Sequence, residues 1–316
     1  MPAVVHWDDV EAQHNEVGPL SSRWSNLGAA AGCVTVGVQR IQIDPGKRST
    51  PAHMEGEEEE IFYVLGGSGV SWQDGETYEV GPGDCLVHLA GREAHTLVAG
   101  GEGLEVLAFG MRARAELAWF PRLELVRVGP AILRPDPGPH QWHREAALGE
   151  LALPEPSERP GRIVNVREVE GERRDGETLG FARRDLGRAG GSERTGLTHV
   201  RVDPGRLSAR PHCHSAEEEI FVVLGGEGRL ELTPSPLARE RGAADERHEV
   251  RAGSVVARPA GSQVAHTFRA GEDGLELLAY GTRNPGDIVY YPRSGTVFLR
   301  GVGVLGRMEH TGWAED

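Results

Sequence analysis

The chain has 316 residues, enough for two ordinary domains with separate cores. Its formal net charge of −14 argues against nucleic acid or an anionic membrane surface as the main partner. No apolar run approaches the roughly 20 residues that a membrane-spanning helix needs. The 44 glycines and 20 prolines favour many short strands joined by turns over long helices.

The amino end and the cysteines indicate the compartment. The stretch MPAVVHWDDVEAQHNE lacks a basic start and an apolar core, so we expect no signal peptide. The chain has three cysteines, Cys33, Cys85 and Cys213. Because their number is odd and their spacing is not that of a disulfide framework, we expect reduced thiols. We therefore expect a cytoplasmic protein.

The sequence repeats itself. NLGAAAG parallels DLGRAGG, GVQRIQIDPG parallels GLTHVRVDPG, and EEEEIFYVLGGSG parallels EEEIFVVLGGEG, all at the one offset that relates Glu60 to Glu219. Further on, LEVLAFGMR parallels LELLAYGTR at the larger offset that relates Leu104 to Leu275. The second copy therefore carries an insertion, mostly the polar stretch 233–247, which we expect to be an exposed loop. The chain is two copies of one fold.

Each copy has the pattern of an all-β domain. Short β-branched runs at 34–36 and 41–43 are followed by an apolar strand at 61–65, which Gly66-Gly67 is expected to close. A hairpin at Asp74-Gly75 and runs at 85–89, 96–98 and 104–109 complete seven or eight strands, typical of an antiparallel sandwich or barrel. The best helix signal is 114–120. We predict a first barrel over 1–128, a proline-rich linker over 129–162 and a second barrel over 163–316.

The stretch PHCHSAEEEIFVVLGGEG, residues 211–228, carries the clearest chemistry. In an extended strand His212 and His214 point the same way, and Glu219 can aim into the same space. Two imidazoles and a carboxylate are an incomplete metal shell. Downstream His266 is the candidate fourth ligand.

Both halves resemble the cupins, and the whole chain resembles a bicupin. The first cupin motif fits Gly205, His212, His214, Glu219 and Gly226, with one gap slightly longer than usual. The second motif fits Gly253, Pro259, Gly261 and His266, with the last gap longer than in the commonest form. The resemblance implies an all-β chain of two tandem cupin jelly-roll (double-stranded β-helix) barrels with few short helices. It also implies that His212, His214, Glu219 and His266 bind a divalent metal.

The first copy departs from this pattern at one ligand. His53, Glu60 and His95 match three of the four positions, but Glu55 stands where His214 stands, and Leu89 replaces the motif proline. Two carboxylates and two imidazoles suit a hard divalent ion. The alternative is a degenerate site in a barrel that serves structure or assembly.

Other polar residues allow two interpretations each. We expect Glu57–Glu59 and Glu217–Glu218 to form a solvated rim, with Glu58 or Glu217 swinging in as a base as the alternative. His88 and Arg258 are equivalent positions that face outward or, if they face inward, meet an acidic substrate group.

The fold leaves the reaction open. Our first hypothesis is a metal-dependent enzyme, a dioxygenase-type oxidoreductase, acting on a small organic substrate at the second site, with Glu219 as the catalytic base. The alternatives are a non-redox isomerase, epimerase or decarboxylase, and a non-catalytic small-molecule-binding cupin. Bicupins that decarboxylate oxalate carry two matched three-histidine sites, and Glu55 breaks that match here. The expected cofactor is iron, manganese or zinc, with nickel and copper as further candidates. The chain is expected as a monomer of two barrels or a homodimer.

Overall fold

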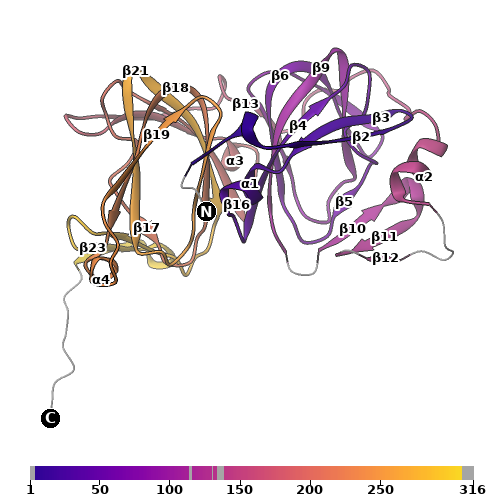
Figure 1. Cartoon of the computed structure of the whole chain (residues 1–316). Coiled ribbons are helices and arrows are strands. Elements are labelled where there is room, and N and C mark those ends of the chain that lie inside the picture. The colour runs from indigo at the N-terminus through magenta and orange to yellow at the C-terminus, as the bar shows by residue number, and fades with distance from the viewer. Residues whose placement is uncertain (1–3, 114–115, 130, 134–138, 308–316) are drawn as a thin grey trace.

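Two β-barrels lie side by side in the computed structural model, which describes residues 4–113, 116–129, 131–133 and 139–307 (Figure 1). This confirms the expected all-β architecture of two tandem barrels. Each barrel combines an eight-stranded and a four-stranded antiparallel sheet. No helix among the described residues is long and apolar enough to span a bilayer.

The N-terminal barrel has the sheet orders β13-β8-β6-β9-β4-β3-β2, with β7 paired to β6, and β12-β11-β10-β5. Its strands are β2 (Ala12–Val17), β3 (Leu20–Ser25), β4 (Val36–Ile43), β5 (Met54–Glu55), β6 (Glu60–Gln73), β7 (Glu76–Val80), β8 (Asp84–His88), β9 (His95–Met111), β10 (Leu117–Phe120), β11 (Leu125–Val128), β12 (Ala131–Leu133) and β13 (Ile163–Asn165).

The C-terminal barrel has the orders β1-β20-β18-β21-β16-β15-β14, with β19 paired to β18, and β17-β22-β23-β24. Its strands are β1 (Val5–His6), β14 (Glu172–Asp175), β15 (Gly180–Asp185), β16 (Thr195–Val202), β17 (Cys213–His214), β18 (Glu219–Pro234), β19 (Glu246–Arg251), β20 (Ser254–Arg258), β21 (Val264–Thr282), β22 (Ile288–Tyr291), β23 (Thr296–Leu299) and β24 (Val304–Arg307).

The helices are short. α1 (Leu27–Ala31) and α3 (Leu186–Ala189) lie between the barrels, and α2 (Gln141–Ala147) lies on the outer side of the N-terminal barrel (Figure 1). The repeated NLG and DLG segments start α1 and α3, because the side chains of Asn26 and Asp185 accept from the amides of Ala29 and Arg188. The remaining helices are α4 (Pro236–Glu240) and the 3-10 turns η1 (Trp7–Asp9), η2 (Pro121–Leu123) and η3 (Arg300–Val302).

One local prediction was wrong and one was partly right. The helix expected at 114–120 is strand β10 from Leu117, and Arg114 and Ala115 lie outside the described residues. The insertion at 233–247 is mostly exposed, as expected, but it is not simply a loop: it holds the end of β18, α4 and the beginning of β19, which extends the sheet beside β18.

The two repeats exchange their first strands. β1 pairs with β20 of the C-terminal barrel, with Val5 opposite Val255, and β13 pairs with β8 of the N-terminal barrel, with Val164 opposite Cys85. Val5 and Val164 are related by the same offset as Glu60 and Glu219, so the exchange follows the internal repeat. Each sheet is therefore completed by a strand from the other copy.

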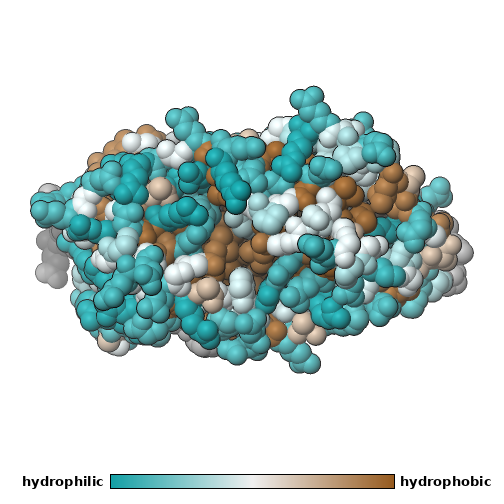
Figure 2. All heavy atoms as spheres, turned by 90° about the horizontal axis from the view of Figure 1, so that it is seen from above, coloured by the Kyte–Doolittle hydropathy of each residue, from teal (hydrophilic) through white to brown (hydrophobic). Residues whose placement is uncertain are grey.

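The apolar strands are buried on both faces. In β6, Ile61 and Tyr63 join a core shared by both barrels, while Phe62 and Val64 pack inside the N-terminal barrel. β18 alternates in the same way, which explains why both strands read as continuous apolar runs. Phe109 of β9 contacts Tyr280 of β21 across the shared core, with ring centroids 5.2 Å apart. From above, hydrophilic residues cover most of the surface and hydrophobic ones show near its middle (Figure 2).

The Gly-Gly pair does not close the strand, contrary to the prediction from sequence. β6 continues to Gln73, and its register shifts between Val64 and Gly69 where the glycines lie. Gly67 has φ +76°, and a Cβ there would lie 2.2 Å from the Gly103 carbonyl oxygen. This close approach requires glycine and produces a β-bulge instead of a turn.

Candidate metal centres in the two barrels

Three of the four candidate ligands of the C-terminal barrel lie in strands, and the fourth lies in an isolated β-bridge. His214 ends β17, Glu219 begins β18, His266 lies in β21, and His212 is bridged to His266 by backbone hydrogen bonds. His214 Nε2 lies 3.3 Å and His266 Nε2 lies 3.1 Å from Glu219 Oε2. The His212 ring centroid is 4.7 Å from that of His266. The structure therefore brings His212, Glu219 and His266 into one group that can hold a metal, and it places His214 against Glu219.

Hydrogen bonds to the outer nitrogens fix how two of the imidazoles point. His212 Nδ1 donates to the Arg210 carbonyl oxygen at 2.8 Å, and His214 Nδ1 lies 2.7 Å from Asp287 Oδ2. Such contacts select the tautomer whose Nε2 is free to bind a metal.

Three buried atoms of this group form no hydrogen bond of proper geometry within the described chain, although they lie near one another. They are His214 Nε2, Glu219 Oε2 and His266 Nε2. Buried polar atoms are nearly always paired, and these three belong to residue types that ligate divalent metals. The donor set therefore fits a divalent ion held by His212, His214, Glu219 and His266.

The charges around the group are strongly coupled. Burial works against ionisation of His214, but the Glu219 and Asp287 carboxylates outweigh it and raise the pKa of His214 to about 10. Burial lowers the pKa of His266 to about 4. Burial also opposes ionisation of Glu219, yet its attraction to His214 holds the pKa of Glu219 well below the usual range. Glu219 is therefore ionised.

Arg258 faces inward beside this group. It pairs across the sheet with Glu219, its Nη2 donates to the Val264 carbonyl oxygen at 3.2 Å, and its buried Nε has no partner in the described chain. Of the two interpretations that the sequence allowed, the inward one is correct. It adds a cation next to the Glu219 carboxylate.

Asp287 is a residue that sequence reasoning missed. Besides holding His214, its Oδ1 accepts from the backbone amides of Ala216 and Glu217. A signal was available, because Glu116 stands at the equivalent position of the first copy, at the offset that relates Leu104 to Leu275. Glu116 likewise accepts from two backbone amides, those of Gly56 and Glu57.

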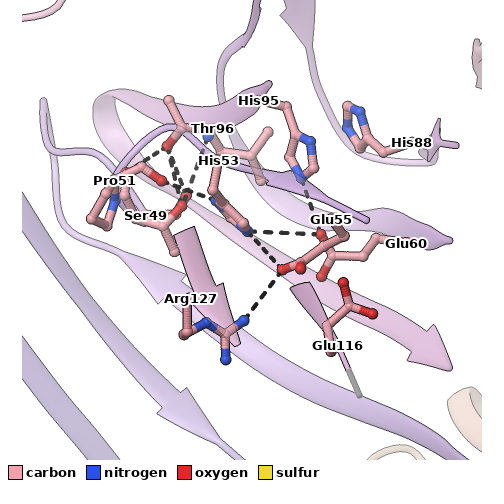
Figure 3. Close-up of polar contacts among 12 residues, drawn as sticks. Ser49, Pro51, His53, Glu55, Glu60, His88, His95, Thr96, Glu116 and Arg127 are labelled. Carbon is pink, nitrogen blue, oxygen red and sulfur yellow. Dashed lines mark hydrogen bonds and ion pairs between the residues drawn. The ribbon is translucent and has the colours of Figure 1, made fainter. Parts of the chain in front are cut away.

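The N-terminal group, drawn in Figure 3, keeps the counterparts of His212, Glu219 and His266 but differs at the position of His214. His95 Nε2 lies 3.0 Å and His53 Nε2 lies 4.0 Å from Glu60 Oε2, and these three residues form a group that can hold a metal. Glu55 Oε1 lies 3.4 Å from His53 Nε2 and 3.6 Å from Arg127 Nη2, so Glu55 forms ion pairs on both sides. Its Oε2 is buried without a partner among the described residues.

His88, the counterpart of Arg258, also faces inward. Its ring stacks on His95 with centroids 3.9 Å apart, and burial lowers the pKa of His88 well below its usual value. His88 is therefore neutral. A cavity of about 460 Å³ opens beside the group, lined in part by Trp24, Phe120 and Trp142.

The expected solvated rim was wrong for three of its glutamates. Glu59, Glu217 and Glu218 are at most 3% exposed. Burial raises the pKa of Glu217 to about 7, and that carboxylate is fixed by Arg300 and the Asn284 amide.

Glu59 and Glu218 each join one barrel to the other. Glu218 accepts from the amides of Val34, Thr35 and Val36 in the N-terminal barrel. Glu59 accepts from the Ser192 hydroxyl and the amides of Glu193, Arg194 and Thr195 in the second copy. We call these two glutamates the reciprocal clasps. Each directly precedes a candidate ligand, Glu60 or Glu219, so each ligand-bearing strand begins at a contact with the other barrel.

Comparison with known proteins agrees with this architecture. The cupin domain family matches residues 39–109 and 198–280. A search of curated proteins finds no match.

Solved structures of Bacillus subtilis oxalate decarboxylase share the fold. One, from a study of its Mn(II) centres, is 16% identical with a TM-score of 0.60, covering 90% of this chain and 78% of that one. Another, at pH 4.6, is 16% identical with a TM-score of 0.58, covering 88% and 75%. The cupin domain model matches both repeated halves, so the chain carries two cupin domains in tandem, at residues 39–109 and 198–280.

Proposed function

We propose that the C-terminal barrel is the active site of a metal-dependent, dioxygenase-type oxidoreductase that acts on a small organic acid. The observation that carries the proposal is the group of unpaired buried atoms on His214, Glu219 and His266 with the Arg258 guanidinium beside it. An ion of iron or manganese at these residues supplies Lewis acidity and a centre for O2 chemistry.

The chain's own residues perform three tasks. His212, His214, His266 and Glu219 hold the ion, and Asp287 and the Arg210 carbonyl orient two of the imidazoles. Arg258 binds the substrate carboxylate through its free Nε–H. Glu219 is also the proposed base, which accepts a proton from the substrate at the carboxylate oxygen that does not hold the ion.

For the N-terminal barrel we propose weaker metal binding by His53, Glu60 and His95. Glu55 contributes less because Arg127 competes for its carboxylate. Zinc, nickel and copper remain candidates for either site, and metal analysis of the purified chain identifies the ion.

The test measures O2 uptake with hydroxy-aromatic and 2-oxo acids on metal-loaded protein, beside Arg258→Gln and His266→Ala. We expect uptake that needs both substrate and metal, a raised KM in Arg258→Gln and no turnover in His266→Ala. Equal turnover without O2 would contradict the proposal.

A decarboxylase is the second candidate, because the similar structures are oxalate decarboxylases. CO2 release from oxalate or a related acid without net O2 uptake would favour it. The inward Arg258 suits this substrate class as well.

A further inference from the structure

A second cavity, of about 510 Å³, lies between the two barrels and outside both candidate metal centres. Residues of β4 and β9 line it from the N-terminal barrel, and residues of β16 and β21 line it from the C-terminal barrel. Trp7 and Val166, which follow the two exchanged strands, complete its wall. We call it the inter-barrel pocket. Its volume is that of an ordinary small-molecule site.

The lining is rich in arginine. Arg40, Arg167, Arg184 and Arg201 face two glutamates, Glu105 and Glu276, in a protein whose net charge is −14. Arg40 pairs with Glu105 at 2.5 Å, and Arg201 pairs with Glu276 at 3.3 Å. His199 also contacts Glu276, with Nε2 2.6 Å from Oε1, so that carboxylate is shared between two basic side chains.

Two of the arginines, Arg167 and Arg184, have no acidic partner within 4 Å among the residues that the structure describes. Arg184 donates from Nε to the Val169 carbonyl oxygen at 3.0 Å. The Tyr63 hydroxyl, also in the lining, has no hydrogen-bond partner in the described part of the chain. The pocket therefore offers donors that the described part of the chain leaves unused.

Comparison of the two copies shows where these cations arise. We compared equivalent positions at the offset that relates Glu60 to Glu219. The first copy has Asp8 where the second has Arg167, Ser25 where it has Arg184, and Gln42 where it has Arg201. None of the three first-copy residues is basic, and Asp8 pairs with Arg40. Three of the four pocket arginines are therefore particular to the second copy and do not follow from the repeated fold, whereas Arg40 belongs to the first copy.

We propose that the inter-barrel pocket binds a small polyanion, an organic phosphate or a polycarboxylate. Guanidinium groups bind phosphate and carboxylate oxygens through paired charge-assisted hydrogen bonds, and several around one pocket favour a ligand with two or more negative charges. Since both barrels contribute to the lining, the bound anion also strengthens their association.

The experiment titrates the full chain with pyrophosphate and, separately, with citrate, by calorimetry and by thermal unfolding. NaCl at matched ionic strength is the control for screening. We expect at least one of the two anions to saturate a single site and raise Tm where NaCl does not. Preference for pyrophosphate assigns the phosphate class, and preference for citrate the carboxylate class.

The variants return the second copy to the residues of the first: Arg167→Asp, Arg184→Ser and Arg201→Gln. Each is expected to weaken binding about tenfold or more, and the triple variant to abolish it. Arg183→Ser is the matched control, because Arg183 pairs with Glu172 and lies outside the lining. Metal content is expected to stay unchanged, which separates this proposal from the proposed function.

Two results would overturn the proposal. One is that neither anion exceeds the effect of NaCl on the wild type. The other is that the triple variant binds the anion as tightly as Arg183→Ser does. If the triple variant fails to fold, the same result from each single variant would overturn the proposal.

Discussion

The two barrels share one backbone framework but carry differently charged residues around the candidate ligands. Where the C-terminal barrel has His214, Arg258 and Asp287, the N-terminal barrel has Glu55, His88 and Glu116. With a divalent ion bound, the C-terminal centre would keep a net positive charge, which is the basis for the anionic substrate proposed above. The N-terminal centre places two carboxylates near the ion and a neutral His88 beside it. The repeat therefore keeps the position of the ligand group while the charged residues around it differ.

The largest expected effect is a loss of metal affinity, which should differ between the C-terminal and N-terminal centres. His266→Ala removes a ligand of the four-residue group and is expected to lower metal affinity about 100-fold or more, an effect at least as large as loss of an orienting partner. Elemental analysis of untagged protein after dialysis measures the loss. His95→Ala is the paired variant and should cost less of the bound metal. Equal losses from both would contradict the difference between the barrels.

The next largest expected effect is the loss of folding stability when one of the reciprocal clasps is removed. Glu218→Ala leaves the amides of Val34, Thr35 and Val36 without their acceptor and is expected to lower the free energy of unfolding by about 2–4 kcal/mol. Urea denaturation at pH 7 measures it. Exposed Glu227→Ala on the same strand should change stability by less than about 0.5 kcal/mol. Matching values for the two variants would show that the clasp contributes nothing to stability.

Substitution of Asp287 should lower metal affinity more than substitution of its counterpart in the first copy, Glu116. Asp287→Asn weakens the contact that orients His214, so metal affinity is expected to fall about 10- to 100-fold. Glu116→Gln should leave affinity within about twofold, because among the described residues the Glu116 carboxylate contacts no histidine. Metal competition with a chromogenic chelator reads out both. A similar change in the two variants would remove Asp287 as an orienting residue.

Glu55→His restores the histidine that the first copy lacks. We expect metal affinity of the N-terminal group to rise about tenfold, because the imidazole does not pair with Arg127 as the carboxylate does. The measurement uses a His266→Ala background, in which the N-terminal group dominates binding. Unchanged affinity would indicate that Glu55 already serves as a ligand.

The smallest effect is a pH dependence of the clasp at Glu59. Burial would raise the pKa of Glu59, but hydrogen bonds from Ser192, Thr195 and two backbone amides outweigh it and lower that pKa. A carboxyl whose folded-state pKa lies below its unfolded value stabilises fully above the unfolded value of about 4.3, and this stabilisation is lost as pH falls through the folded pKa. The stability advantage of wild type over Glu59→Gln should therefore shrink between pH 6 and pH 3. A constant difference across that range would show that Glu59 does not ionise as inferred.

Much of the candidate site could be predicted from local pattern. The spacing of His212 and His214 and the repeated position of Glu60 and Glu219 placed the ligands, because strand alternation and an internal repeat are both visible in the chain. Asp287 was missed because an isolated aspartate has no local signature, and its role follows from contacts with His214 and with the Ala216 and Glu217 amides that only the fold creates. The Gly-Gly bulge was misread because a bulge and a turn require the same glycine.

The sequence by itself determined that the chain is two copies of an all-β barrel and which residues can ligate a metal. Strand periodicity and repeat offsets depend only on the order of residues. Only the tertiary structure decided that the copies exchange strands, that Glu59 and Glu218 are buried and that Arg258 faces inward. The physical reason is that burial and charge pairing depend on the other barrel or on distant strands, and a glutamate that will be buried between barrels has the same local sequence as one in solvent.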